Sequence, residues 1–498
     1  MAAEKCYQPR NPERSLLYQV VAGQLETFLA RRRELDRELP GFVEQEFRAF
    51  LDCGVLARGF LRVHCDACGK DRLVPFSCKK RGFCSSCGGR RMADTAAHLV
   101  DNVFPVVPVR QWVLSLPFAL RYRLAFDAPL MGDVVGAFAR CVFGSLRARA
   151  RDRLGLARTR CGAVTFIQRF GSALNLTPHF HMLAIDGIYA AGAGAGGEPE
   201  FHELPAPDDD EVADVVADSA RRIQMLIKRR GLSDSDFEEA DPLFRDNPGL
   251  AAIAAASVQG RIAAGPNAGK RLATLGDQID PEALGSHSGP RCATLAGFSL
   301  HADVAVPAKD RARLERLCRY AARPALATDR LSRLPDGRLS YRLKRPWRNG
   351  ATEVVFEPED LVARLAALVP APRAHLVRYQ GVFGPAAAWR AGVVPEVRTQ
   401  TARSSVVRAD AEPAEYADAP LEIESQKRIS PARNYSWSQL MRRVFLVDVL
   451  QCDRCGGSMR ILTVIMAPEA ARKILDCLRL PSRPPPLAPA RPERSSNS

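Results

Sequence analysis

The stretch "NLTPHFHMLAIDGIY", residues 175–189, decides the fold and carries two histidines one residue apart. Its apolar run is typical of a buried strand, in which successive side chains point to opposite faces. We therefore expect His179 and His181 to share one face, while Phe180 and Met182 point to the other. Two imidazoles at this spacing can hold one divalent cation, or they can form a half-exposed pair on a sheet surface, and the pair alone leaves both readings open.

The segments around this strand predict an α+β fold. "GAVTFIQRF" (162–170) is expected to be its antiparallel neighbour, because only "GSALNLTP" separates the two strands. A hairpin is expected around Asn349–Gly350, a dipeptide that tight hairpin turns prefer. The order of strands and helices is that of an α+β domain rather than an alternating βα barrel. Further strands are expected at 109–116 and 297–306, and helices within 12–58 and at 127–154, 209–231 and 308–323.

Composition favours a polyanionic partner. The 498 residues include 71 Lys+Arg and 56 Asp+Glu, which gives a net charge of +15 and a pI near 9.4. Nucleic acid is the commonest partner of a protein with so positive an electrostatic field, although Arg-rich helix surfaces give the same net charge. The sequence starts without the apolar stretch of a signal peptide, and no uninterrupted apolar run is long enough to span a bilayer. We expect a cytoplasmic protein, in which 14 cysteines favour metal sites over disulfides.

Two CxxC pairs predict a zinc site near the N-terminus. Cys65 and Cys68 are followed after 15 residues by Cys84 and Cys87, a spacing typical of a closed structural zinc centre. His64 and Cys78 are alternative ligands for this site or for a second one, although bystanders are the favoured interpretation. A reactive thiol pair is the alternative, and basic residues within the segment suggest contact with DNA.

A further CxxC pair lies near the C-terminus. Cys452 and Cys455 are followed only by Cys477, so half of a site is missing from this part of the sequence. The pair is a possible second zinc site, a half-site completed by another chain, or plain structure. Ser436 and Gln439 fit a capping box that begins a helix just before it. The sequence shows no internal repeat.

A tyrosine flanked by arginines is the candidate nucleophile. In the helix expected over 310–323, Tyr320 lies beside the apolar stripe, and three arginines lie along its side. Guanidiniums there would bind phosphate oxygens and favour the phenolate, the form that attacks. The alternative is an ordinary half-buried tyrosine. The arginines are Arg313, Arg316 and Arg323.

Together these features resemble the HUH superfamily of single-strand DNA nucleases, in which U is an apolar residue. The motif is His179–Phe180–His181, and the chain is most similar to IS91-type and ISCR-like rolling-circle insertion-sequence transposases. The resemblance rests on "LVPFSCKKRGFCSSCGGRRMADTAAHLVD", "GAVTFIQRFGSALNLTPHFH", "RYAARPALATDRL", "YRLKRPWRNGATEVVFEPEDLVARLAALVPAPRAHLVRYQGVF" and "VDVLQCDRCGGSMRIL". Some members carry two catalytic tyrosines four residues apart, but Arg316 occupies the earlier position, which favours Tyr320 as the single nucleophile.

The resemblance implies a tyrosine transesterification on single-stranded DNA. His179 and His181 would hold Mg²⁺ or Mn²⁺, with His301 or Gln168 as the third ligand, and Tyr320 would bond to the DNA 5′ end. Arg342 and Lys344 of the hairpin would contact the strand. A nucleoid-associated protein, and a homodimer that supplies a second tyrosine, would suit this scheme. The expected parts are a helical and zinc-binding domain (1–103), an HUH-type catalytic domain with a central antiparallel sheet (104–390), a linker (391–434), a CxxC module (435–480) and a disordered tail (481–498).

Three other functions would fit parts of the sequence. A small-molecule metallohydrolase needs more histidines and acids on successive strands than the sequence offers. A non-catalytic zinc-dependent DNA-binding protein explains the charge and cysteines but leaves the histidine pair and Tyr320 without a role. A replication initiator or relaxase would use the same chemistry, but the N-terminal zinc region and the C-terminal segment favour a transposase.

Overall fold

A seven-stranded antiparallel sheet forms the centre of the molecule in the computed structural model, which describes residues 10–192, 197–232, 241–276, 289–347, 349–395 and 435–491. The strand order is β10-β11-β3-β6-β5-β16, with β12 also paired to β3. The expected antiparallel pairing of β5 and β6 is confirmed, with Gln168 opposite His179 and Phe166 opposite His181. The strands are β3 (Val109–Ser115), β5 (Gly162–Phe170), β6 (Leu176–Ile185), β10 (Cys292–Leu295), β11 (Phe298–His301), β12 (Ala305–Val306) and β16 (Val377–Gly381).

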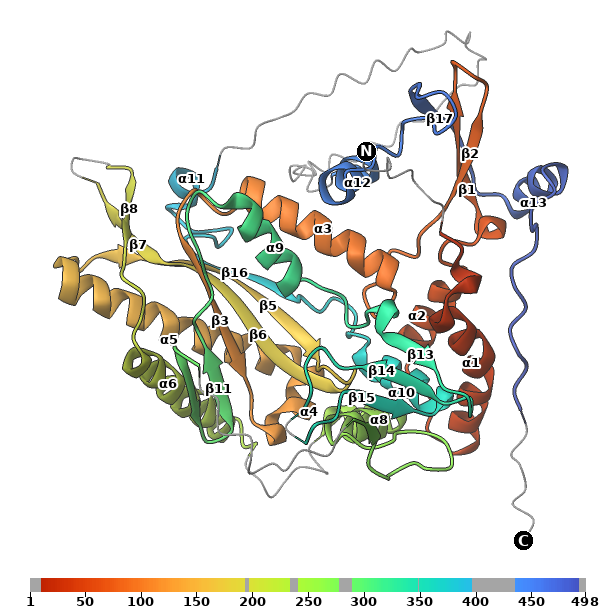
Figure 1. Ribbon diagram of the computed structural model, residues 1–498. Helices are drawn as coiled ribbons and strands as arrows, with labels where there is room; N and C mark the ends of the chain where they lie inside the picture. Colours follow the sequence, from red (N-terminus) through yellow and green to blue (C-terminus); the bar gives the residue numbers. More distant parts are fainter. Residues whose placement is uncertain are drawn as a thin grey trace, which may run out of the picture.

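Helices cover both faces of this sheet (Figure 1). α5 (Ala128–Leu154) and α6 (Asp209–Arg229) pack on the face that receives Phe180 and Met182 of β6. α3 (Ser85–Asn102) and α9 (Arg311–Ala321) pack on the opposite face, with Leu183 and Ile185. The period of two in β6 therefore separates two cores, and the histidines belong to the α9 face.

The N-terminal helices share a second core with residues from the other half of the chain. α1 (Leu16–Glu34) and α2 (Gly41–Asp52) pack with α8 (Pro248–Val258) and α10 (Pro358–Leu368). Arg31 of α1 pairs with Glu359 at the start of α10. A four-stranded sheet completes this part, in the order β13 (Leu331–Arg333), β14 (Leu339–Arg342), β15 (Glu353–Phe356) and β9 (Ala273–Leu275).

The β14–β15 hairpin is confirmed, but its connection is longer than a two-residue turn. The strands end at Arg342 and begin again at Glu353. Gly350 lies in the connection with a φ of 78° and donates its backbone N–H to the carbonyl of Trp347. Lys344 lies in this connection, and its side chain reaches the ring of Tyr320.

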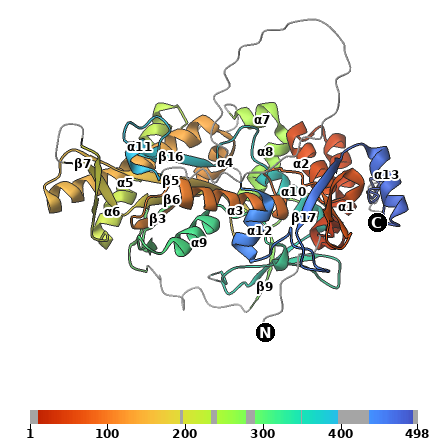
Figure 2. The same ribbon diagram turned by 90° about the horizontal axis from the view of Figure 1, so that it is seen from above.

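A small sheet near the right-hand end of Figure 1 joins the two ends of the chain. β17 (Met459–Ile465) pairs with β1 (Phe60–Cys65), which pairs with β2 (Asp71–Pro75). α13 (Pro468–Cys477) packs beside it, and α12 (Trp437–Phe445) begins at the expected Ser436–Gln439 capping box. Figure 2 shows the same grouping from above, with β17, α13 and α1 at one end and α5, α6 and β7 at the other.

The remaining elements connect these parts. The expected linker lies outside the described residues from 396 to 434. Residues 481–491, expected to be disordered, instead run along α1, where the backbone of Ala488 bonds to Ala22 and that of Arg491 to Thr27. The remaining connecting helices and strands are η1 (Pro12–Arg14), η2 (Leu56–Arg58), η4 (Thr328–Arg330), β4 (Thr159–Arg160), β7 (Gly187–Ala191), β8 (Pro199–Glu203), α4 (Phe118–Phe126), α7 (Pro242–Asp246) and α11 (Arg390–Val393).

Among the described helices, only α5 is long and apolar enough to cross a bilayer by length and composition. Its most apolar stretch is 61% buried in the protein, where it covers the central sheet. A core helix passes the same test, so α5 is accounted for by packing.

Candidate functional site

The two histidines of β6 lie side by side on the α9 face of the sheet. Their ring centroids are 5.0 Å apart. The backbone carbonyl of Thr177 is 2.8 Å from Nδ1 of His179, and the Gln111 amide is 2.8 Å from Nδ1 of His181. Nε2 of His181 is buried without a hydrogen-bond partner in the described part of the chain. Each ring is thus fixed through Nδ1.

Both imidazoles are neutral at physiological pH. Burial lowers the pKa of His181 to about 3, helped by the nearby His179, and burial also lowers the pKa of His179. A metal ligand must be the neutral imidazole, so the site keeps the histidines in the ligating form.

Tyr320 faces His181 from α9. The two rings lie 5.7 Å apart, edge to face. Leu314, Cys318 and Ala321 form the buried stripe of the helix, whereas Tyr320 is 36% exposed, as its position beside the stripe predicts. The guanidinium of Arg311, at the first turn of α9, donates to backbone carbonyls at the end of α3, including that of Phe104 at 2.8 Å. α9 is therefore fixed with the phenol at the edge of the site.

Two cations lie against the Tyr320 ring. The ammonium of Lys344 is 4.4 Å from the ring centroid, and the guanidinium carbon of Arg323 is 4.8 Å from it. The phenol is thus accessible and surrounded by positive charge, the environment that an anionic phosphodiester needs.

Gln168 connects the histidine strand to the tyrosine helix. It lies opposite His179 on β5, and its amide nitrogen donates to the backbone carbonyls of Tyr320 at 3.2 Å and Ala321 at 2.8 Å. These carbonyls end the helix and have no partner within it. The amide oxygen of Gln168 is buried without a partner among the described residues.

His301, the other expected third ligand, lies apart from the histidine pair. It is opposite Val113, which is itself opposite His181, so a whole strand separates the two histidines. Its ring nitrogens contact Cys292 (2.8 Å) and Ser299 (3.1 Å). The structure thus brings Gln168, not His301, beside the pair.

The other predicted DNA-binding residues are exposed. Arg313 and Arg316 lie on earlier turns of α9, and Arg342 ends β14. In the part of the chain that the structure describes, their side chains make no hydrogen bond or ion pair. Only Arg323 and Lys344, of the five predicted cations, contact Tyr320 there.

Four cysteines near the N-terminal helices form a metal-binding group, and they are not the four that the spacing predicted. Cys84 and Cys87 lie with Cys53 and Cys78, and all four Sγ atoms are within 4.8 Å of one another. The Sγ of Cys87 is 3.3 Å from that of Cys78 and 3.7 Å from that of Cys53. A tetrahedral Zn²⁺ with Zn–S bonds of about 2.3 Å places its sulfurs about 3.8 Å apart, so these cysteines fit zinc.

The CxxC spacing does not indicate Cys53, and Cys78, interpreted from the sequence as a bystander, is one of the four. Cys53 ends α2, and only the packing of α2 on the segment around Phe83 brings it to the other three. Cys65 and Cys68 belong to another group, with Cys452 and Cys455. The predicted single zinc centre is therefore corrected to two separate groups, because β1 extends the first CxxC pair away from the second.

Family models match two parts of the chain. The Y2_Tnp model, described as "Putative transposase", matches residues 162–389, and the Zn_Tnp_IS91 model, described as "Transposase zinc-binding domain", matches residues 22–116. The chain belongs to the IS91-type transposases. Neither the curated proteins nor the solved structures include a significant match.

Membership accounts for several features of this transposase. Its function is DNA transposition, its partner is DNA, and its N-terminal region binds structural zinc. The first model covers the histidine strand and Tyr320, and the second contains all of Cys53, Cys78, Cys84 and Cys87. Cys452 and Cys455 lie outside both matches.

Proposed function

We propose that this transposase cuts and joins single-stranded DNA by metal-assisted tyrosine transesterification in rolling-circle transposition. One observation carries the proposal: the Tyr320 ring lies 5.7 Å from the ring of the buried His181, beside the partly buried His179, with Lys344 and Arg323 against the tyrosine ring. A sheet that places the histidine motif on a central antiparallel strand beneath the tyrosine helix supports an HUH-type catalytic domain.

The residues fit a divalent cation. Nε2 of His181 and Oε1 of Gln168 are buried polar atoms without partners among the described residues, and His179 lies between them in the strand pairing. We propose these three as the protein ligands. If Nε2 of His181 binds the metal, Nδ1 carries the proton. The side-chain oxygen of Gln111 then accepts a hydrogen bond from Nδ1–H, which requires the amide to be turned with its oxygen toward the ring. When bound, Mg²⁺ or Mn²⁺ polarises the scissile phosphate and stabilises charge in the transition state.

The reaction exchanges one phosphoester for another. The phenolate oxygen of Tyr320 attacks phosphorus, and the P–O3′ bond breaks. The phenol proton passes to solvent, and the released 3′-oxygen takes up a proton to become a hydroxyl. The 5′-phosphate stays bonded to Tyr320, so a later 3′-hydroxyl can reverse the step and join a new strand.

The surroundings of the phenol suit a single strand. Lys344 and Arg323 meet backbone phosphates, and the partly buried Trp347 on the same connection offers a ring on which a base can stack. Arg313, Arg316 and Arg342 would extend this basic track. Because Arg316 stands four residues before Tyr320, each protomer has one nucleophile, and holding two DNA ends at once would take a homodimer.

The test is covalent capture of DNA. Full-length protein is incubated with labelled single-stranded DNA from the element's end, with Mn²⁺ or EDTA, and resolved on a denaturing gel. A metal-dependent adduct is expected in the wild type and in the control Tyr189→Phe, whose ring lies in β7, and not in Tyr320→Phe. An adduct that survives Tyr320→Phe would place the nucleophile elsewhere, and DNA binding without any adduct would favour a non-catalytic DNA-binding protein.

A further inference from the structure

The chain contains two CxxC knuckles of the same design, far apart in the sequence. The first is Cys65–Asp66–Ala67–Cys68–Gly69, and the second is Cys452–Asp453–Arg454–Cys455–Gly456. In each, the glycine has a positive φ (70° and 73°) and donates its backbone N–H to the carbonyl of the first cysteine, at 2.8 and 2.9 Å. The first cysteine's own N–H bonds to the residue after that glycine, at 2.9 and 2.8 Å. The two turns thus present their thiols in the same way.

The two knuckles face each other. The Sγ of Cys65 is 3.5 Å from that of Cys455, and the Sγ of Cys68 is 3.6 Å from that of Cys452. All four Sγ atoms lie within 4.8 Å of one another. These separations are near the roughly 3.8 Å expected around tetrahedral Zn²⁺ and far beyond a disulfide bond of about 2.05 Å.

Ion pairs join each knuckle to residues that come soon after the other knuckle in the sequence. Asp453 of the second knuckle is 2.8 Å from the ammonium of Lys70 and 2.9 Å from the guanidinium of Arg72. Asp66 of the first knuckle is 2.7 Å from the guanidinium of Arg460, on β17. The pairing is reciprocal, so the knuckles are built to meet as a pair.

The apolar contacts at this junction are few. The buried residues around the thiols are Val63, Cys65, Cys452 and Met459, and the same small sheet has one further buried cluster of four residues, Phe60, Ile465, Ala471 and Leu475. A unit with so small a core depends on a metal or a covalent link for its stability. Gly457 leaves space beside the thiols. A Cβ at this position would lie 3.2 Å from the Sγ of Cys455 and 3.3 Å from that of Cys65.

We infer that Cys65, Cys68, Cys452 and Cys455 hold a second structural zinc ion, shared between the N-terminal hairpin and the C-terminal segment. This ion anchors β17 on β1. The same segment carries α12, whose Arg443 donates to Asp101 of α3 at 2.9 Å and to Glu315 of α9 at 2.7 Å. The second zinc thus fixes the C-terminal segment against the helix that carries Tyr320.

Zinc content of the full-length protein tests this inference. Elemental analysis should find two zinc ions per chain in the wild type and one in the double variant Cys452→Ser/Cys455→Ser. The matched control is Cys477→Ser, an exposed cysteine of α13 outside both groups, which should keep two. One zinc in the wild type, or two in the double variant, would overturn the second site.

Thiol labelling of the wild type gives a measurement that does not depend on how the variant folds. In zinc-loaded protein, Cys65, Cys68, Cys452 and Cys455 should resist alkylation while Cys477 reacts. A chelator should make the four react together. Rapid alkylation of Cys452 and Cys455 in the zinc-loaded protein would contradict the site, whatever the protein does to DNA.

Discussion

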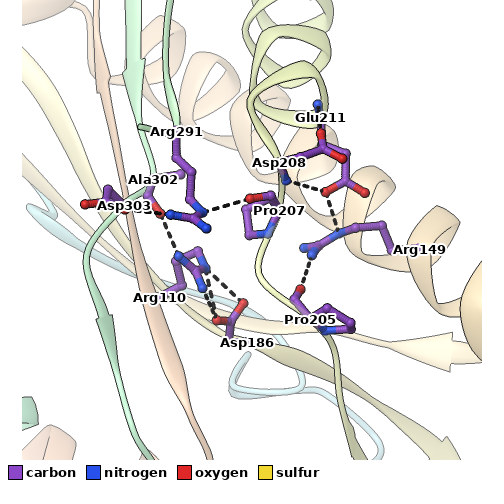
Figure 3. A network of polar contacts seen from close by, with 10 residues as sticks. All are labelled: Arg110, Arg149, Asp186, Pro205, Pro207, Asp208, Glu211, Arg291, Ala302 and Asp303. Atoms are coloured by element: carbon purple, nitrogen blue, oxygen red, sulfur yellow. Dashed lines mark hydrogen bonds and ion pairs between the residues drawn. The ribbon is translucent and has the colours of Figure 1, made fainter. Parts of the chain in front are cut away.

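Replacing Asp186 by alanine should loosen the sheet that carries the histidines. Asp186 follows β6 and pairs with Arg110 of β3; both are buried, at 6% and 4% exposure. The guanidinium donates to the carboxylate from Nε, at 3.1 and 3.0 Å, and from Nη2, at 2.7 Å. Its Nη1 donates to the backbone carbonyl of Ala302 at 2.9 Å (Figure 3). The variant leaves Arg110 buried with the Ala302 bond alone.

The expected cost follows from this burial. Removing one partner of a buried ion pair costs about 3–5 kcal/mol, because the remaining charge is neither solvated nor paired. At about 1.4 kcal/mol per factor of ten, opening of β3 becomes roughly 100 to 4,000 times more frequent. The assay is hydrogen–deuterium exchange by mass spectrometry on peptides that cover residues 109–115, because amides exchange through such local openings.

Two variants separate the ion pair from general damage. Asp303→Ala removes an exposed carboxylate of the same network, paired with Arg291, and should change exchange by about fivefold at most. Arg110→Met/Asp186→Leu replaces both charges and should recover most of the protection. Exchange of Asp186→Ala within fivefold of the wild type, or a double variant no better protected than the single one, would contradict this role of the ion pair.

Three further predictions concern the site and its metals. Gln111→Leu removes the contact that orients His181. In a metal titration, it should raise the Mn²⁺ concentration needed for half-maximal adduct formation by about 10- to 100-fold. An unchanged Mn²⁺ requirement would show that the ring is held by packing alone. Lys344→Ala should weaken single-stranded DNA binding alike for all sequences and reduce the salt slope by about 0.7, measured by fluorescence anisotropy at several salt concentrations, whereas an unchanged slope would remove the lysine from the phosphate track. Cys84→Ser should cost several kcal/mol or prevent folding of the α2–α3 region, followed by circular dichroism and thermal melting, because structural zinc supplies folding free energy there; a melting curve like that of the wild type would contradict a metal in the Cys53 group.

The central part of the fold was predictable because its signals are local. The alternation in β6 separated His179 and His181 from Phe180 and Met182, and a short connection made β5 its neighbour. The stripe of Leu314, Cys318 and Ala321 on α9 likewise placed Tyr320 at a boundary. These patterns depend on period and spacing, which the sequence carries directly.

The cysteine groups could not be assigned in the same way. Spacing favoured one site from four nearby cysteines, but Cys53 belongs to no motif and Cys452 lies hundreds of residues away. The repeated turn in the two knuckles was a signal that the sequence did carry, since both read Cys-Asp-x-Cys-Gly. His301 lies in the expected strand, but the sequence did not indicate that β3 would lie between that strand and β6.

Peptide mapping of the covalent adduct tests whether Tyr320 is the nucleophile. The adduct is digested with a nuclease and trypsin, and tandem mass spectrometry locates the remaining nucleotide. We expect a nucleotide joined through its 5′-phosphate to Tyr320. A nucleotide on another residue, or one joined through its 3′-phosphate, would contradict it.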